Sequence, residues 1–208
     1  MAAVSINKIS GAIISGIEKA QMDYAKMSGG EWVWNAAEYV LTTYIAKEID
    51  SLEGSKYVTI EHSGLAAVGD AGAIGPGPKP LKARLRGRFD LVLWWANSKP
   101  RAVIEVKNHP SGPKGWIKDI DRIAAVLDMQ KDNSSFNFGA FAYYYSARDG
   151  RQLSAEEKIA GKLERMKEFV ASQLSDKFRV EQVESDIHNE GEYGAWVAAC
   201  IIIKRVNQ

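Results

Sequence analysis

The chain has 208 residues, of which 46% are hydrophobic and 25% are charged, and its formal net charge is +1. These values are typical of a folded soluble protein and exclude an intrinsically disordered chain. A chain of this length can bury a sizeable core, so we expect one domain that needs no disulfide or structural metal. The single cysteine, Cys200, lies in an apolar run, which favours a buried, inert thiol over a nucleophile.

Neither a signal peptide nor a membrane span is expected. The apolar residues near the start are spaced rather than continuous, and Lys8, Glu18 and Lys19 interrupt them. The longest apolar run, residues 196–203, is far too short to cross a bilayer. We therefore expect a cytoplasmic protein that does not enter a membrane.

Positive charge is concentrated in the middle of the chain. Residues 79–118 contain ten Lys or Arg and only two acidic residues, a local net charge of +8, which leaves −7 for the remainder. Such an asymmetry predicts one surface that binds a polyanion. Solvated strand ends would produce the same count, so charge alone does not choose between the two.

Hydrophobic spacing and turn signals predict the elements in chain order. The first part comprises an amphipathic helix over residues 1–27, a helix over 31–52, a strand over 56–62 and an irregular, mobile Gly/Pro-rich loop over 69–80. The second comprises strands over 85–95 and 101–107 joined by a turn, a helix over 116–130, a strand over 136–146, a helix over 154–174 with a capping box, and strands over 177–184 and 195–206. This order predicts an α/β protein with a mixed central sheet flanked by helices.

The residues most informative about chemistry are Asp90, Glu105 and Lys107. Side chains alternate along a strand, so Glu105 and Lys107 share a face, and a hairpin brings Asp90 beside Glu105. The opposite face is expected to carry their apolar neighbours: Phe89, Leu91 and Leu93 in the first strand, and Ile104 and Val106 in the second.

Two adjacent carboxylates repel each other at neutral pH and require compensation. Mg²⁺ supplies it, since this ion typically uses one or two carboxylates and keeps several waters. A neighbouring lysine can orient a metal-bound water and neutralise a phosphate, which is the equipment for hydrolysing a phosphodiester. The alternative is a structural cross-strand ion pair, against which stand the apolar strands, the central aspartate and the basic surroundings.

Asp90 followed by Glu105-Val106-Lys107 on consecutive strands, within an αβββαβ order, resembles the PD-(D/E)XK or restriction-endonuclease-like nuclease superfamily. The resemblance covers about residues 31–146 of a single domain spanning 1–208, with an added N-terminal helix in 1–30 and a C-terminal helix and strands in 147–208. It implies that Asp90 and Glu105 bind Mg²⁺, for which Mn²⁺ can substitute, and that Lys107 is the catalytic lysine. Phe89 stands where the family often has proline.

Two helices add candidates. The resemblance implies a further catalytic and metal-binding glutamate on the first core helix, which is Glu38 here; on a helical wheel it falls inside the apolar arc, where it is either paired or snorkels to water. In the helix after the lysine, Asp119 and Arg122 are expected as helix-terminus charges and surface pairs. His109 is expected as a solvated loop residue.

The sequence therefore predicts a Mg²⁺-dependent endonuclease acting on DNA. Phosphate contacts are assigned to five basic residues: Arg84, Arg86, Arg88, Lys114 and Lys118. A homodimer is compatible with cutting both strands. The alternatives are a nuclease-like module that only binds nucleic acid within a larger complex, and a structural subunit that oligomerises through its apolar faces.

Overall fold

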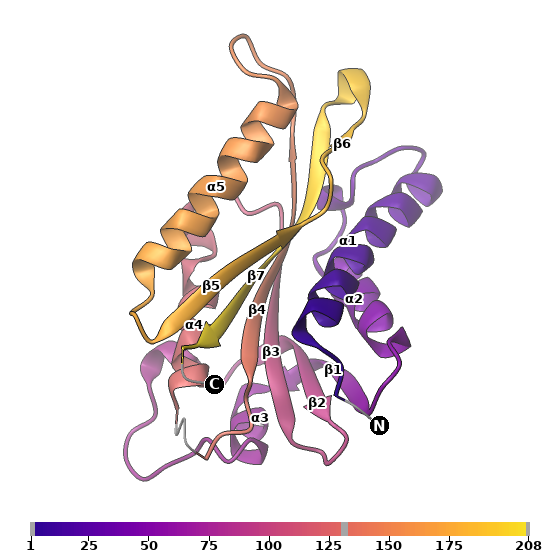
Figure 1. Cartoon of the computed structure of the whole chain (residues 1–208). Helices are drawn as coiled ribbons and strands as arrows, with labels where there is room; N and C mark the ends of the chain where they lie inside the picture. The colour runs from indigo at the N-terminus through magenta and orange to yellow at the C-terminus, as the bar shows by residue number, and fades with distance from the viewer. Residues whose placement is uncertain (1–2, 130–132, 207–208) are drawn as a thin grey trace.

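The computed structural model describes residues 3–129 and 133–206, and its central sheet separates two layers of helices (Figure 1). The strands are β1 (Lys56–Ser63), β2 (Arg88–Trp95), β3 (Pro100–Asn108), β4 (Phe138–Ala147), β5 (Phe178–Glu184), β6 (His188–Asn189) and β7 (Ala195–Arg205). The α-helices are α1 (Ile6–Ser28), α2 (Tyr39–Ser51), α3 (Gly64–Asp70), α4 (Ile117–Asp128) and α5 (Ala155–Gln173). Short 3₁₀ turns are η1 (Val33–Asn35), η2 (Leu81–Ala83), η3 (Pro113–Gly115) and η4 (Gly191–Tyr193).

The sheet is mixed, as the sequence predicted. Its strand order is β1-β2-β3-β4-β7-β5, with β6 paired to β7. Strands β1, β2 and β3 are antiparallel neighbours, whereas β3 and β4 are parallel and are connected through α4. The remaining pairs, β4–β7 and β5–β7, are antiparallel. The C-terminal ends of β3 and β4 consequently meet at the same edge of the sheet.

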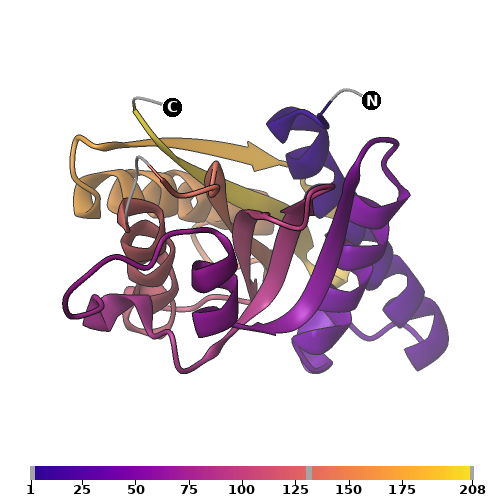
Figure 2. The same ribbon diagram turned by 90° about the horizontal axis from the view of Figure 1, so that it is seen from below.

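Two hydrophobic cores lie on the two faces of this sheet. Helices α1 and α2 cover one face, and α3, α4 and α5 cover the other, as the view from below shows (Figure 2). The C-terminal strand β7 is buried along nearly its whole length and carries side chains into both cores, which explains its continuous apolar run. Cys200 is fully buried there, and burial raises the pKa of its thiol, as expected for an inert residue.

The N-terminal helix forms as predicted. Ser5 accepts a hydrogen bond from the Lys8 backbone at its start, and Gly29 ends it with a left-handed φ of 77°. Gly16 lets α1 approach α2 closely, because a Cβ at this position would lie 2.6 Å from the Cα of Ile45. None of the helices in the described residues combines the length and apolarity needed to cross a membrane.

Several predicted boundaries were wrong. The second helix begins at Tyr39 rather than at residue 31, because η1 and an extended residue, Ala36, interrupt the chain before it. The start of the predicted 69–80 loop instead ends α3, a short helix that Ser63 caps and that the sequence analysis missed. The helix after β3 ends at Asp128; position 130, its predicted end, lies outside the described residues. The Ser154–Glu157 capping box at the start of α5 is confirmed.

Candidate active site

The candidate site lies where β2 and β3 separate. Their regular pairing runs only as far as Leu91 and Ile104. Beyond that point the Val106 backbone N–H donates to the Asp90 carboxylate over 2.6 Å instead of to a strand carbonyl. The aspartate therefore replaces a ladder hydrogen bond, and the sheet opens beside it.

The backbone departs from regular strand geometry beside Asp90, and the predicted alternation of side chains along β2 was wrong there. Glu61, opposite Asp90 in the β1–β2 pair, has a left-handed φ of 53°. Leu91 and Leu93 pack under α1 and α2 as expected, but Phe89 belongs to the core under α4. Strand alternation is broken at Asp90, so the strict period of two failed at this position.

Glu105 pairs with a residue that the sequence analysis placed at the surface. Its Oε1 accepts from Arg122 over 2.8 Å, and both side chains are almost completely buried. The prediction of Arg122 as a surface charge was therefore wrong. Val126, four residues further along α4, is also buried and extends the apolar face of the helix to include Arg122.

The Arg122 guanidinium is surrounded by backbone carbonyls and one aromatic ring. It donates to the backbone carbonyls of Ala83, Arg84 and Arg88 and lies 4.0 Å from the centre of the Phe89 ring. Together with the Glu105 pair, these contacts hold the turn before β2 next to Glu105 of β3. Arg122 thus anchors two sequence motifs that are separate in the chain.

Lys107 connects β3 to the start of α2 and to α4. Its ammonium lies 3.2 Å from Glu38 Oε1 and 3.8 Å from Asp119 Oδ2, on the same face of β3 as Glu105. Glu38 is the residue before α2, not a residue inside it, and its second oxygen accepts from the Asn108 backbone over 2.8 Å. Of the two alternatives for Glu38, paired or solvated, the structure supports pairing. Asp119 also accepts from Arg84 over 2.7 Å, so its prediction as a paired charge at the start of α4 is confirmed.

Asn108 and His109 fix the chain after the lysine. The Asn108 side chain donates to the carbonyls of Val33 and Ala36, which ties the segment before α2 to the end of β3. His109 has a left-handed φ of 56°, and its Nε2 lies 2.9 Å from the Ser146 carbonyl. The His109 side chain is therefore fixed by a hydrogen bond, and the prediction of a solvated loop histidine was wrong.

Burial and neighbouring charges shift the pKa values of Glu105, Asp90 and Lys107. Burial, reinforced by the charge of Asp90, raises the pKa of Glu105 to about 8 although Arg122 opposes the change. Burial also raises the pKa of Asp90, against the hydrogen bonds from Val106 and Glu105. For Lys107, burial favours the neutral amine, but Glu38 and Asp119 outweigh it and raise the pKa, so the side chain is an ammonium at neutral pH.

Asp90 and Glu105 are the two carboxylates here that could hold a hard divalent cation. Burial, reinforced by the neighbouring Asp90, raises the pKa of Glu105 to about 8, and a cation in place of the proton would remove the repulsion between the two carboxylates. Glu38 does not complete a third ligand in this arrangement, since both of its oxygens face Lys107 and Asn108. Within the described ranges, no group of three or more Asp, Glu, His or Cys residues is arranged to hold a metal ion.

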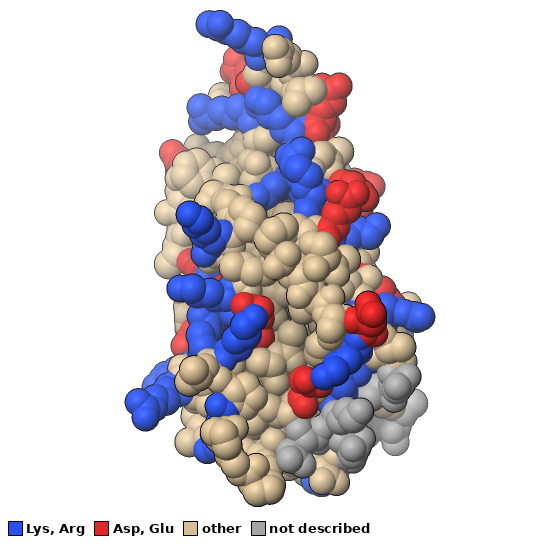
Figure 3. All heavy atoms as spheres, turned by 90° about the vertical axis from the view of Figure 1, so that its left-hand side faces the viewer, with Lys and Arg blue, Asp and Glu red and all other residues tan. Residues whose placement is uncertain are grey.

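The predicted phosphate-binding residues are exposed around this site. Arg84 and Arg86 belong to the turn before β2, Arg88 is the first residue of β2, and Lys114 and Lys118 flank the start of α4. The sequence count overstates the surface charge, however. Arg101 is buried against Trp95 and Phe138, and Asp119 and Asp121 on α4 pair with Arg84 and Lys82. Basic and acidic side chains are accordingly mixed on the face seen in Figure 3.

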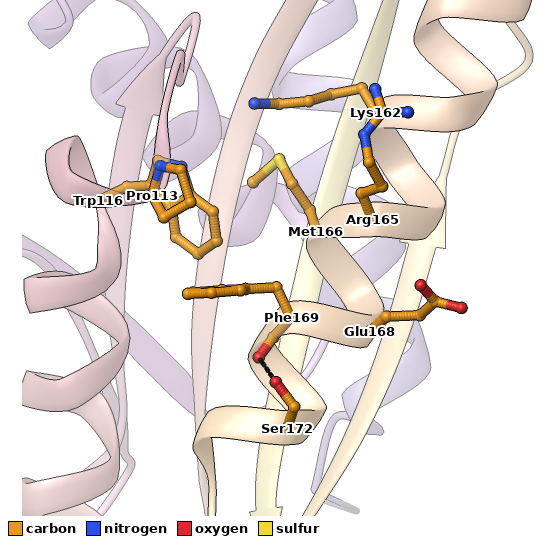
Figure 4. A pocket seen from close by; sticks show the side chains of 8 residues that line it. All are labelled: Pro113, Trp116, Lys162, Arg165, Met166, Glu168, Phe169 and Ser172. Carbon is orange, nitrogen blue, oxygen red and sulfur yellow. Dashed lines mark hydrogen bonds between the residues drawn. The ribbon is translucent and has the colours of Figure 1, made fainter.

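A groove of about 510 Å³ adjoins the site between the start of α4 and α5 (Figure 4). Pro113 and Trp116 line one side, and Met166 and Phe169 project from α5 opposite them, while Lys162 reaches across the upper end. Trp116 lies one helical turn before Asp119, so the groove is separated from Lys107 by about one turn of α4.

No protein-family model matches the chain, and no curated protein or solved structure matches it either.

Proposed function

We propose that this protein is a Mg²⁺-dependent nuclease of the PD-(D/E)XK type that hydrolyses phosphodiester bonds in DNA. The observation that carries the proposal is the convergence of Asp90, Glu105 and Lys107 at the point where β2 and β3 separate. Pairs of buried carboxylates with strongly perturbed pKa values next to a lysine cluster at catalytic sites more often than at structural ones.

The order of elements supports a restriction-endonuclease-like core. Helix α2 is followed by the antiparallel strands β1, β2 and β3, and then by α4 and a parallel strand, β4. This is the αβββαβ order that the sequence resemblance implies, with α3 inserted after β1. Strands β5, β6 and β7 extend the sheet beyond that core.

Asp90 and Glu105 are the residues that would hold the metal ion. When bound, Mg²⁺ supplies Lewis acidity and lowers the pKa of a coordinated water. The chain's own contribution is to hold both carboxylates rigidly: the Val106 backbone fixes Asp90 and Arg122 fixes Glu105. Such rigid support is what a preorganised site requires.

Lys107 acts as a fixed positive charge and not as a base, because its raised pKa keeps it protonated. Glu38 accepts a hydrogen bond from the ammonium and Asp119 lies 3.8 Å from it, so its two remaining donors can orient the attacking water or a phosphate oxygen. In this proposal Glu38 positions Lys107. To bind the metal ion as well, the Glu38 carboxylate would have to break its hydrogen bonds with Lys107 and Asn108.

The exposed arginines before β2 would bind the phosphate backbone. Arg122 ties the carbonyls of Ala83, Arg84 and Arg88 to Glu105, so the basic turn is held next to the metal ligands. Binding through such residues is expected to weaken steeply as salt rises. Cutting of both strands of a duplex would use two copies of the site, and we expect a homodimer on that substrate.

A second candidate is a nuclease-like module that binds nucleic acid without cutting it. One observation favours it: the buried Arg122 guanidinium already bonds Glu105, and within the described chain no three-ligand metal group accompanies it. A cation supplied by the protein can stabilise the acidic pair without any metal.

One experiment separates the two candidates. Supercoiled plasmid, linear duplex, single-stranded DNA and RNA are incubated with wild type, Lys107→Ala and Glu105→Ala, each in Mg²⁺, Mn²⁺ or EDTA. The nuclease proposal expects cutting that requires metal and falls at least 100-fold in both variants. Lys177→Ala is the matched control, since Lys177 is exposed and pairs with Asp128 away from the site. Retention of DNA in EDTA with no cutting in either metal would support the binding module instead.

A further inference from the structure

A row of aromatic rings extends from the candidate active site across the ends of β3 and β4. His109 stacks on Tyr145 with ring centres 4.8 Å apart and planes 19° from parallel. On its other side it contacts Trp34, whose ring centre is 5.8 Å away. The Lys162 ammonium lies 5.3 Å from the centre of the Tyr145 ring and continues the row toward α5. We call Trp34, His109 and Tyr145 the aromatic row.

The row is held in place at the cost of backbone strain. His109 adopts a left-handed φ, a conformation that costs a non-glycine residue on the order of 1 kcal/mol. Its backbone N–H donates to the Tyr144 carbonyl over 2.9 Å, and Nε2 must carry a proton to bond the Ser146 carbonyl. The ring is therefore fixed face-on against Tyr145, two residues after Lys107.

Beyond Trp34 the surface is hollowed into a groove of about 520 Å³. Trp32, Trp34 and Tyr193 line it together with Arg148, and Trp34 and Tyr193 remain 44% and 63% exposed. Exposed aromatic rings that line one groove mark a binding surface more often than an accident of folding. The hydrogen bonds of Asn108 to Val33 and Ala36 hold this surface against the end of β3.

The charges of this groove favour a base over a phosphate. Two carboxylates line it, Glu31 and Glu190, held by Asn35 and by the Trp196 indole N–H respectively. They would repel a phosphate, whereas the flat faces of bases stack on aromatic rings regardless of sequence. Bases inside a duplex already cover each other's faces, so a stacking surface binds unpaired nucleotides.

We propose that the groove beyond the aromatic row, with the exposed rings of Trp34 and Tyr193, binds the unpaired bases of a nucleic-acid strand whose backbone passes Lys107. The inference rests on the proposed nuclease function and deepens it, because it identifies the substrate as single-stranded nucleic acid or a frayed end. The Lys162 ammonium lies beside Tyr145 and supplies positive charge for a phosphate of such a strand.

Binding in EDTA tests this inference separately from cutting. Fluorescence anisotropy measures the affinity of wild-type protein for a labelled 15-nucleotide single strand and for the same sequence as a duplex. Trp34→Ala is expected to weaken single-strand binding about tenfold and Tyr193→Ala several-fold, with duplex binding changed less than twofold. Trp34→Phe should restore most of the affinity, since it keeps a ring.

Leu81→Ala is the matched control, because Leu81 is a 96% exposed apolar residue on the basic segment. Thermal unfolding of each variant checks that the fold is intact, as expected for exposed positions. Unchanged single-strand affinity in Trp34→Ala, equal losses for strand and duplex, or no wild-type binding to single strands would overturn the inference. Tight, Trp34-dependent single-strand binding without cutting in any metal would leave the inference standing while the nuclease proposal fails.

Discussion

Replacing Glu105 with glutamine should stabilise the protein at alkaline pH. In the folded protein Glu105 is buried beside Asp90 and titrates at about 8, against an ordinary value of 4.5 in the unfolded chain. Between these values the folded state binds one more proton than the unfolded state. Stability conferred by this group is therefore complete below about pH 4.5 and is lost as the pH rises through 8.

The size of the effect follows from that proton. One extra bound proton changes the free energy of unfolding by about 1 kcal/mol per pH unit, so wild type should lose a few kcal/mol between pH 5 and pH 8. The Glu105→Gln amide is neutral at every pH, accepts from Arg122 as the carboxyl does, and can donate to Asp90. The variant should match wild type at pH 5 and exceed it at pH 8 by the few kcal/mol that wild type has lost.

Urea unfolding followed by tryptophan fluorescence, at both pH values and without metal, measures this difference. Glu181→Gln is the control, because Glu181 is 42% exposed and paired with Lys204 at the surface. A variant less stable than wild type at pH 8 would refute the reasoning, since it would mean that Glu105 is ionised and that its pair with Arg122 stabilises the fold. Mg²⁺ should stabilise wild type at pH 8 and leave the variant unchanged.

Three further substitutions test the supports of the site and the fold. Arg122→Met should lower the free energy of unfolding, measured in urea, by about 3 kcal/mol, because it leaves buried carbonyls without a hydrogen-bond donor. A loss below about 1 kcal/mol would show that the contacts of Arg122 do not stabilise the fold. Gly16→Ala should cost about 2 kcal/mol in thermal unfolding, since its Cβ would meet Ile45, and an unchanged melting temperature would argue against the close helix contact. Asn108→Ala should cost about 2 kcal/mol and speed proteolysis of the segment before α2, and a protease-resistant variant would show that other contacts hold this segment.

Local patterns were sufficient to locate most elements. The spacing of isoleucines predicted α1, alternation predicted β1 and β3, and the Ser154–Glu157 pair predicted the start of α5. These signals succeed because backbone geometry and one buried face determine both the residue pattern and the element. They failed for α3 and η1, which are short segments set by caps and by contacts with distant strands.

The sequence also predicted that Glu105 and Lys107 share a face, because side chains two residues apart on a strand point to the same side. The burial of Arg122 was not predicted, because it depends on carbonyls from the turn before β2 and on a carboxylate from β3. Polar residues on a helix are normally solvated, and only their tertiary partners reverse that expectation. The apolar residue Val126, four positions after Arg122, was the one local sign that this side of α4 faces the interior.

The sequence by itself determined the element types, the α/β class and the chemistry available at Asp90, Glu105 and Lys107. Only the tertiary structure decided how these groups are charged and held. The pKa of Glu105 depends on burial and on its distance from Asp90, and Lys107 depends on Glu38, which lies 69 positions away in the chain. Electrostatic interactions act through space with strengths set by separation and solvent exposure, and neither quantity is present in the order of residues.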